Sequence, residues 1–260
     1  MTLPEHDDRD ELVIDSRVNG VPMKALRGLH GQVVDTLGRA IGRGDLQPGT
    51  LIHPDELSSE YGTSRTVIRE ALRVLESKGL IIARPKTGTV VLPSSDWNLL
   101  DHDVILWRSM GPASSVQFHD LLALRIGVEP LAASAAAKHA GAGQVAEMRR
   151  AIDQMEAAIA SGDNTSYTEA DVRFHSLILE SSNNGALRQL SGAIEAVLRA
   201  REQLNLLPAV LEDQTLEEHR DLLEAIEARD AGLAETTSRH LIDLASTELL
   251  NELKSKGSQG

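Results

Sequence analysis

Three arginines in the amino-terminal third have a spacing that suits contact with DNA. Arg65, Arg69 and Arg73 recur every four residues in a segment whose remaining positions are largely apolar. Residues four apart lie above one another on a helix, so the three guanidinium groups point the same way. A planar guanidinium can donate two hydrogen bonds to a guanine edge or to a phosphate. The spacing favours a helix in the DNA major groove, and a solvated basic face on a surface helix is the alternative.

Four residues in the second half are of the types that bind metal ions. Asp171 and His175 are four apart, so a helix would bring them to one face, and His219 and His240 follow 21 residues apart. One carboxylate and three imidazoles suit a borderline divalent metal such as zinc, nickel or manganese. The sequence alone does not show that separate helices bring the four together, and isolated surface or core histidines are the alternative.

Arg125 is a further candidate binding residue. It lies between Leu124 and Ile126, so its charge is expected to point into a partly buried space, where it could bind the carboxylate of a small molecule. A salt bridge to Glu129, four residues on, explains the same pattern equally well. Pro130 predicts a kink or a boundary in this helix.

The segments around the three arginines have the order of a winged helix-turn-helix. Ser64 is placed to cap the arginine-bearing helix, and a Pro/Gly turn joins two β-rich runs that form the wing. Lys86 and Gly88 make the wing tip small and basic, as suits a loop that approaches phosphates or the minor groove. The predicted elements are helices over 29–43, 54–61 and 65–78 and strands over 80–84 and 89–92.

The rest of the chain shows helical periodicity almost throughout. Short breaks between long amphipathic helices predict an antiparallel bundle. Trp97 and Trp107 are expected to pack the intervening linker onto this bundle. The predicted helices cover 99–109, 114–139, 142–161, 167–182, 185–205, 208–229 and 231–254.

We therefore predict a mainly α protein, with an amino-terminal winged helix-turn-helix and a carboxyl-terminal antiparallel all-helical bundle. The predicted domains are a disordered acidic tail (1–22), a winged helix-turn-helix DNA-binding domain (23–93), a linker with the first helix (94–110), and a helical effector-binding and dimerisation domain (111–254).

Composition limits the classes of function. The 260 residues carry a net charge of −13, yet residues 20–95 hold 10 basic and 7 acidic side chains, so the local field suits a polyanion. Cysteine is absent, which excludes disulfides and thiol chemistry. No apolar run approaches the roughly 20 residues that span a bilayer, and the first 19 residues lack the pattern of a secretory signal. A cytoplasmic protein without a membrane partner is expected.

Several segments together resemble the GntR family of transcriptional regulators, in its FadR subgroup, whose carboxyl-terminal domain is of the all-helical FCD type. The segments that carry the resemblance are Leu46-Gln47-Pro48-Gly49, the run from Ser64 to Leu72, the wing Thr87-Gly88-Thr89, and the set Asp171, His175, His219 and His240.

The resemblance implies a homodimer that binds double-stranded operator DNA and responds to a small carboxylate in its bundle. It implies that Arg65 and Arg69 contact bases, Ser64 and Thr66 phosphates, and Gly88 the groove beneath the wing. Likewise it implies that Asp171, His175, His219 and His240 hold a divalent metal ion and that Arg125 meets the effector. The linker over 96–107 is similar to that of sugar-acid regulators, such as those for gluconate or galactonate, so a repressor of a catabolic operon is expected.

Asp55 departs from the family pattern, because many relatives carry there an arginine that reaches DNA. No catalytic residue is expected. A metal-dependent enzyme or a metal sensor fused to a DNA-binding head is the alternative, since a metal with open positions also activates water. Glu180 and Glu218 are the conceivable general bases, and both are predicted to be solvated.

Overall fold

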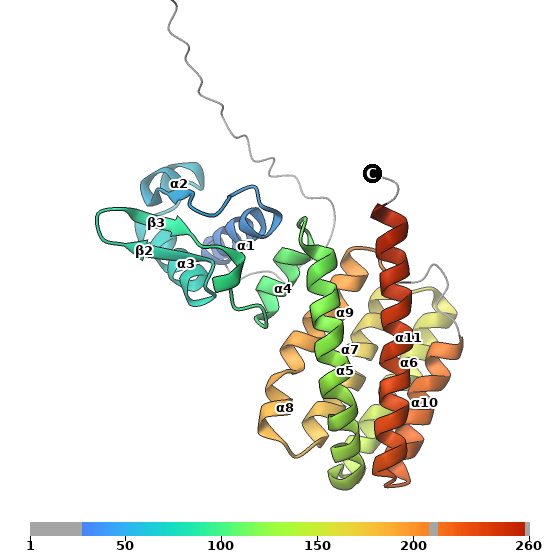
Figure 1. The fold of residues 1–260 in the computed structure, drawn as a ribbon. Coiled ribbons are helices and arrows are strands. Elements are labelled where there is room, and N and C mark those ends of the chain that lie inside the picture. Colours follow the sequence, from blue (N-terminus) through green and yellow to red (C-terminus); the bar gives the residue numbers. More distant parts are fainter. Residues whose placement is uncertain (1–27, 208–212, 258–260) are drawn as a thin grey trace, which may run out of the picture.

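The computed structural model describes residues 28–207 and 213–257, which form two parts joined through one helix (Figure 1). The amino-terminal part combines three helices with a small sheet, and the carboxyl-terminal part is a bundle of long helices, so the predicted fold class is confirmed. The tail expected over 1–22 and the beginning of the helix expected from residue 208 lie outside the described residues.

The amino-terminal part forms around α3. Its apolar side chains Ile68, Ala71, Leu72 and Leu75 are buried against α1 and the sheet, whereas the positions between them face outward. The elements are α1 (Gly28–Arg43), β1 (Leu51–Ile52), α2 (Pro54–Glu60), α3 (Arg65–Ser77), β2 (Ile81–Arg84) and β3 (Gly88–Val91).

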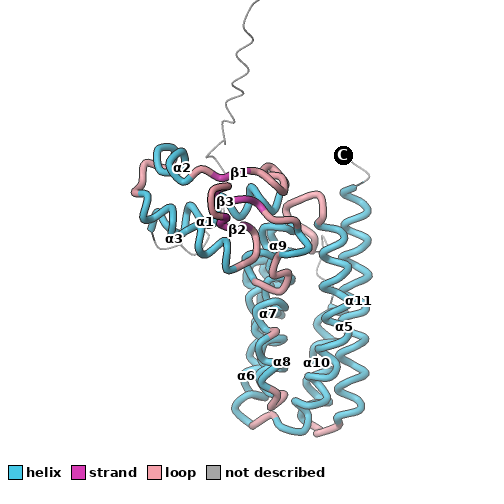
Figure 2. The backbone as a smooth tube through the Cα atoms, turned by 60° about the vertical axis from the view of Figure 1, so that its left-hand side comes forward, coloured by secondary structure: helices cyan, strands magenta, loops and turns pink. Residues whose placement is uncertain are grey.

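The three strands form one antiparallel sheet in the order β1-β3-β2 (Figure 2). Strand β1 was not predicted, because two residues are too short to show an alternating pattern. Backbone hydrogen bonds from Gly49 to Val91 and from Val91 to Thr50 hold this segment at the sheet edge. Lys86 and Gly88 form the wing turn with positive φ angles of 66° and 97°.

The bundle helices are long and lie side by side, with α5 along α11 and α6 along α7 (Figures 1 and 2). The segment predicted as one helix over 185–205 is divided at Leu190 into α8 and α9. The elements after the sheet are η1 (Ser94–Asp96), α4 (His102–Ser109), α5 (Ser114–His139), α6 (Ala142–Ser161), α7 (Asn164–Ser181), α8 (Gly185–Gln189), α9 (Ser191–Gln203), α10 (Asp213–Glu227) and α11 (Ala231–Gly257).

Helix α5 continues through Pro130, where the sequence predicted a kink or a boundary. A proline lacks the N–H that would bond to the carbonyl four residues earlier, which here is that of Ile126. Arg239 of α11 donates to the Ile126 carbonyl at 3.4 Å, and so supplies a partner for the group that the proline leaves free. The neighbouring helix thus compensates for the missing bond.

Helix α4 joins the two parts, because it contacts α1 on one side and α5 and α9 on the other. Trp107 lies against α1, and its Nε1 donates to Asp35 Oδ1 at 2.9 Å. The ring approaches so closely that a Cβ added to Gly38 would lie 2.5 Å from it. The prediction that Trp97 and Trp107 pack the linker onto the bundle is wrong, since both belong to the core of the amino-terminal part.

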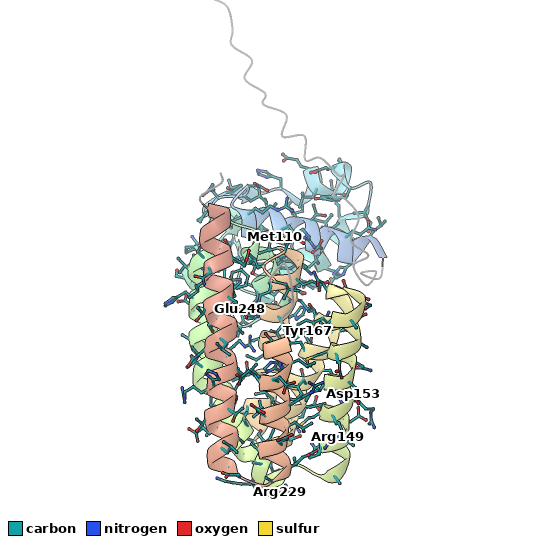
Figure 3. All side chains as sticks on the ribbon, turned by 90° about the vertical axis from the view of Figure 1, so that its right-hand side faces the viewer. Met110, Arg149, Asp153, Tyr167, Arg229 and Glu248 are labelled. Carbon is teal, nitrogen blue, oxygen red and sulfur yellow. The ribbon has the colours of Figure 1, made fainter. Side chains whose placement is uncertain are left out.

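Side chains fill the space between the bundle helices (Figure 3). Met110 lies at the end next to the amino-terminal part and Arg229 at the opposite end, with Tyr167 and Glu248 nearer to Met110. Within 28–207 and 213–257, none of the helices has the length and apolarity needed to cross a membrane.

Candidate functional site

Asp171, His175 and His219 form a buried cluster between α7 and α10. The first two are neighbours on one face of α7, and the third comes from α10. His175 Nε2 lies 3.3 Å and His219 Nε2 lies 3.1 Å from the same Asp171 oxygen, Oδ1. One potential ligand atom from each residue lies within 4.8 Å of the other two, which is close enough for all three to bind one metal ion.

The other ring nitrogens of the two histidines face acceptors. His175 Nδ1 lies 2.6 Å from Glu129 Oε2, and His219 Nδ1 lies 2.6 Å from the Thr215 carbonyl oxygen. The Thr215 carbonyl favours the proton on His219 Nδ1 and so leaves its Nε2 lone pair for a metal, as is usual for metal-binding histidines. The His175–Glu129 contact is a close ion pair without hydrogen-bond geometry. Both Nε2 atoms already point toward the Asp171 carboxylate, and a metal ion bound there would displace the Nε2 proton of His175.

The charges of the cluster are strongly coupled. Burial alone would raise the pKa of Asp171, but His175 and His219 hold that pKa well below its usual value. Burial likewise opposes ionisation of Glu129, yet Arg125 and His175 lower its pKa to about 2. Burial would lower the pKa of His175, but Glu129 and Asp171 raise it to about 9. The two carboxylates thus attract a cation between them, and a proton on His175 fills that role in the absence of metal.

The donor set of the cluster fits a divalent metal ion. Two imidazole nitrogens and one carboxylate oxygen suit zinc, nickel or manganese, and three protein ligands leave positions for a small molecule. The burial of all three residues and the Nδ1 acceptors of both histidines agree with this use. The bundle therefore contains a buried Asp/His/His cluster able to bind a metal.

His240, the fourth ligand expected from the sequence, is not brought to this cluster. Its side chain is 58% exposed, and its Nε2 lies 3.3 Å from Glu218 Oε1. The α11 residues that face the cluster's cavity are Leu241, Ala245 and Glu248, which follow helical spacing. His240 precedes this series by one position, and one residue turns a side chain by about 100° around a helix. The structure thus replaces the expected four ligands with three.

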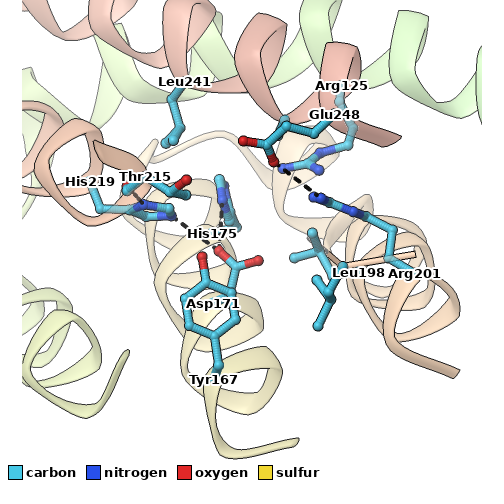
Figure 4. A pocket seen from close by; sticks show the side chains of 12 residues that line it. Arg125, Tyr167, Asp171, His175, Leu198, Arg201, Thr215, His219, Leu241 and Glu248 are labelled. Atoms are coloured by element: carbon cyan, nitrogen blue, oxygen red, sulfur yellow. Dashed lines mark hydrogen bonds and ion pairs between the residues drawn. The ribbon is translucent and has the colours of Figure 1, made fainter. Parts of the chain in front are cut away.

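A cavity adjoins the cluster and is lined by residues of five helices of the bundle, α5, α7, α9, α10 and α11 (Figure 4). About 20 Å³ is open to the centre of a water molecule, enough for one water, so a larger ligand requires lining side chains to move. The cavity is lined by Arg125, Tyr167, Asp171, His175, Leu198, Arg201, Leu207, Thr215, His219, Leu241, Ala245 and Glu248.

Arg125 is buried in this cavity wall and paired internally. Its Nε donates to Glu129 Oε1 at 2.5 Å, so the salt bridge considered from the sequence is present. The pair is buried, and breaking a buried pair by removing one partner is strongly destabilising. Its Nη1 has no hydrogen-bond partner among the described residues. Arg125 therefore anchors Glu129 behind His175 while still presenting one donor to the cavity.

Sequence reasoning missed several residues of the site. Glu129 was considered only as a salt-bridge partner, and its contact with His175 joins α5 to α7. Thr215 carried no signal because it acts through its backbone carbonyl. Arg201 and Glu248 lie on α9 and α11, far apart in the chain, and only the folded bundle brings them to one cavity.

The residues predicted to contact DNA all lie in the amino-terminal part and are all exposed. They are Ser64, Arg65, Thr66, Arg69 and Arg73 of α3 and its cap, and Lys86 and Gly88 of the wing. Ser64 caps α3, since its Oγ accepts from Val67 N at 3.3 Å.

Two of the three arginines have carboxylate neighbours. Arg65 Nε lies 2.8 Å from Asp55 Oδ1, and Arg73 Nη1 lies 2.6 Å from Glu70 Oε1. Both pairs are largely exposed, so they are weak and can open at little cost. Asp55, the departure from the family pattern, thus lies beside an arginine predicted to contact bases.

The winged helix-turn-helix with an exposed arginine face, joined to a helical bundle with a buried cavity, defines a two-part class of DNA-binding regulator. The family model "Bacterial regulatory proteins, gntR family" matches residues 29–91, and the FCD domain model matches residues 120–244. The chain belongs to the GntR family of bacterial regulatory proteins and carries an FCD domain.

Individual relatives agree with this family. The chain is 35% identical over 224 residues to the galactonate operon transcriptional repressor of Escherichia coli (strain K12), covering 85% of this chain and 96% of the relative. It is 31% identical over 176 residues to an uncharacterised HTH-type transcriptional regulator of the same organism, covering 67% and 76%.

Solved structures share the fold. Lar, described as controlling the Listeria monocytogenes agr system, aligns with a TM-score of 0.60 at 17% identity, covering 86% of this chain and 97% of that one. Escherichia coli McbR/YncC aligns with a TM-score of 0.53 at 19% identity, covering 87% and 99%.

Proposed function

We propose that this protein is a repressor of a sugar-acid catabolic operon, released from its operator when a small carboxylate such as galactonate or gluconate enters the bundle cavity. One combination of features carries this proposal: an exposed arginine face on α3, and a buried cavity in the same chain. That cavity is lined by two arginines and by residues of the types that bind metal ions. The galactonate repressor among the relatives directs the proposal to sugar acids.

The arginine face is the proposed DNA contact. Arg65 and Arg69 would contact bases and Arg73 the phosphates beyond them, with Ser64 and Thr66 at the backbone and Lys86 and Gly88 in the neighbouring groove. A homodimer would place two such faces on the half-sites of a two-fold operator. DNA as partner implies action in the bacterial cytoplasm.

The buried cluster is the proposed metal site. Asp171, His175 and His219 would hold a zinc, nickel or manganese ion, and a bound divalent ion supplies Lewis-acid coordination for the oxygens of a hydroxy acid. Glu129 orients His175 for this role. The cationic wall around Arg125 would orient an anionic ligand. For a regulator, the ligand is expected to be bound there without being chemically converted.

The position of α4 explains how the cavity could control α3. Helix α9 lines the cavity and contacts α4, and α4 is fixed to α1 through Trp107. Helix α1 in turn packs on α3. A ligand that shifts α9 would therefore shift the DNA-binding part, and a small change in the separation of two faces breaks register with one half-site. Coupling of this kind is typically about 1–3 kcal/mol.

Fluorescence anisotropy with labelled DNA from upstream of the gene tests the proposal. The protein should prefer this DNA to random duplex, and galactonate or gluconate with zinc, nickel or manganese should weaken binding about 5- to 150-fold. Arg69→Ala should abolish the preference, whereas Arg150→Ala, an exposed arginine of α6, should not.

Three outcomes count against the proposal. Equal binding of promoter and random DNA in every ligation state would refute operator recognition. Release by metal alone, with no added effect of any acid, would identify a metal sensor. Chemical conversion of the acid by the metal-loaded protein would identify an enzyme.

A further inference from the structure

Arg201 of α9 is paired less closely than the other arginine in the cavity, because its ion pair with Glu248 is long (Figure 4). Its residue exposure is 6%, so it is removed from water almost completely. Its Nη2 lies 3.7 Å from Glu248 Oε2, which is beyond hydrogen-bond distance, and its Nε has no hydrogen-bond partner among the described residues. Arg125, by contrast, donates to Glu129 at 2.5 Å.

The surroundings of Arg201 leave its charge only partly compensated. Burial is the largest influence and lowers the pKa of its guanidinium, and Arg125 lowers it further. Asp171 raises this pKa, as do Tyr167 and Glu248, but not enough to restore the usual value. A buried cation without a close, hydrogen-bonded anion is costly, and such groups are concentrated at functional sites. An additional anion in this cavity would therefore be stabilised most strongly beside Arg201.

We propose that Arg201 receives the carboxylate of the effector and that Glu248 occupies this place until the effector binds. The inference rests on the proposed function, namely that a small carboxylate enters the cavity, and it names the residue that recognises the anion. Arg125 then serves chiefly to position Glu129 and His175, and its remaining donor, Nη1, is a secondary contact.

Glu248 is the more exposed of the two carboxylates that line this cavity. The other, Asp171, is 11% exposed and lies between His175 and His219. The Glu248 side chain is 36% exposed and comes from α11 at the edge of the cavity, so it can turn into water. The cavity as it stands has room for one water, and withdrawal of Glu248 would provide part of the space that a sugar acid needs.

The arrangement also defines the class of ligand. Arg201 and the Asp171–His175–His219 cluster line the same cavity, so one small molecule can reach both. Its anionic group would pair with Arg201, and a hydroxyl or oxo oxygen further along would face the cluster. A hydroxy acid satisfies both demands, whereas the corresponding amide offers the hydroxyl groups without the charge.

Titration calorimetry of the metal-loaded full chain, with galactonate and gluconate against galactonamide and gluconamide, tests this assignment. Wild type should bind the acids more tightly than the amides. Arg201→Gln should bind the acids roughly 10- to 100-fold more weakly, the loss expected for charge-assisted hydrogen bonds, with little change for the amides. Arg199→Gln, on the same helix but paired with Glu169 and Glu195, should bind as wild type.

Glu248→Gln provides the second test. Removal of a partly exposed competitor should tighten binding of the acids roughly two- to fivefold. Unchanged metal affinity in each variant shows that the cluster is intact. If Arg201→Gln binds the acids as wild type does, the assignment is wrong, and if Glu248→Gln does not bind them more tightly, Glu248 does not hold the place. If wild type binds no acid at all, the proposed function itself fails.

Discussion

Replacement of Gly38 by alanine tests whether Trp107 fixes α4 to the amino-terminal part. The added Cβ would lie 2.5 Å from the indole atoms Cδ2 and Cε3, well inside van der Waals contact. Helix α1 is also close to α4 one turn further on, where a Cβ added to Gly42 would lie 2.6 Å from the Trp107 backbone carbonyl. The Nε1 hydrogen bond to Asp35 holds the other edge of the ring. The clash must therefore be relieved by movement of α4 away from α1.

The magnitude follows from two opposing contributions. Alanine in place of glycine within a helix stabilises by about 0.5–1 kcal/mol, because the unfolded chain has less freedom to lose. Overpacking of a well-filled core costs about 1–3 kcal/mol. Gly38→Ala should therefore reduce the free energy of unfolding by about 0–2.5 kcal/mol. Gly127→Ala, on the exposed side of α5 with no atom within 4 Å of the new Cβ, should increase it by about 0.5–1 kcal/mol.

Urea denaturation followed by tryptophan fluorescence provides the assay. The chain has two tryptophans, Trp97 and Trp107, and both belong to the core of the amino-terminal part, so the signal reports on this junction. Gly38→Ala should also lose part of its ligand response in DNA binding, while Gly127→Ala should retain it. The reasoning is refuted if Gly38→Ala is as stable as Gly127→Ala, since no steric conflict would then exist at Trp107.

Other substitutions test the site and the DNA contact. Glu129→Gln should lower metal affinity about 10- to 100-fold, measured by competition with a chelating dye, because the carboxylate that orients His175 is lost. His240→Ala should leave metal affinity unchanged within error while His219→Ala removes most of it, and equal losses would show that His240 does bind. Asp55→Ala should change the preferred operator base opposite Arg65, measured by selection from a randomised duplex, and an identical preferred sequence would show that the pair does not orient Arg65.

The sequence predicted the fold well wherever local chemistry determines it. The Ser64 cap and the apolar spacing of α3 placed the arginines on the outer face, and glycine or proline marked most helix ends. Features that depend on tertiary partners were not predictable. The two residues of β1 form a strand because β3 lies beside them, and Arg239 of α11 donates to the Ile126 carbonyl that Pro130 leaves without its usual partner.

The candidate site shows the same division. Asp171 and His175 were paired correctly by their four-residue spacing, which is a local property of one helix. His219 joins them, but a histidine's position in the sequence does not fix which way its helix is turned, and His240 faces Glu218 for that reason. The role of Arg201 depends on how α9 and α11 meet, which no sequence spacing records.

The small volume of the bundle cavity bears on the kinetics of the response. The closed cavity admits about one water, so the proposed effector could enter only when the cavity opens transiently. Its association rate constant should therefore fall below the roughly 10⁵–10⁷ M⁻¹s⁻¹ of unhindered docking. The need for this opening would also slow the dissociation of the effector. A bound regulator would then stay off its operator for some time after the metabolite is exhausted, so transcription would follow the average supply and ignore brief fluctuations.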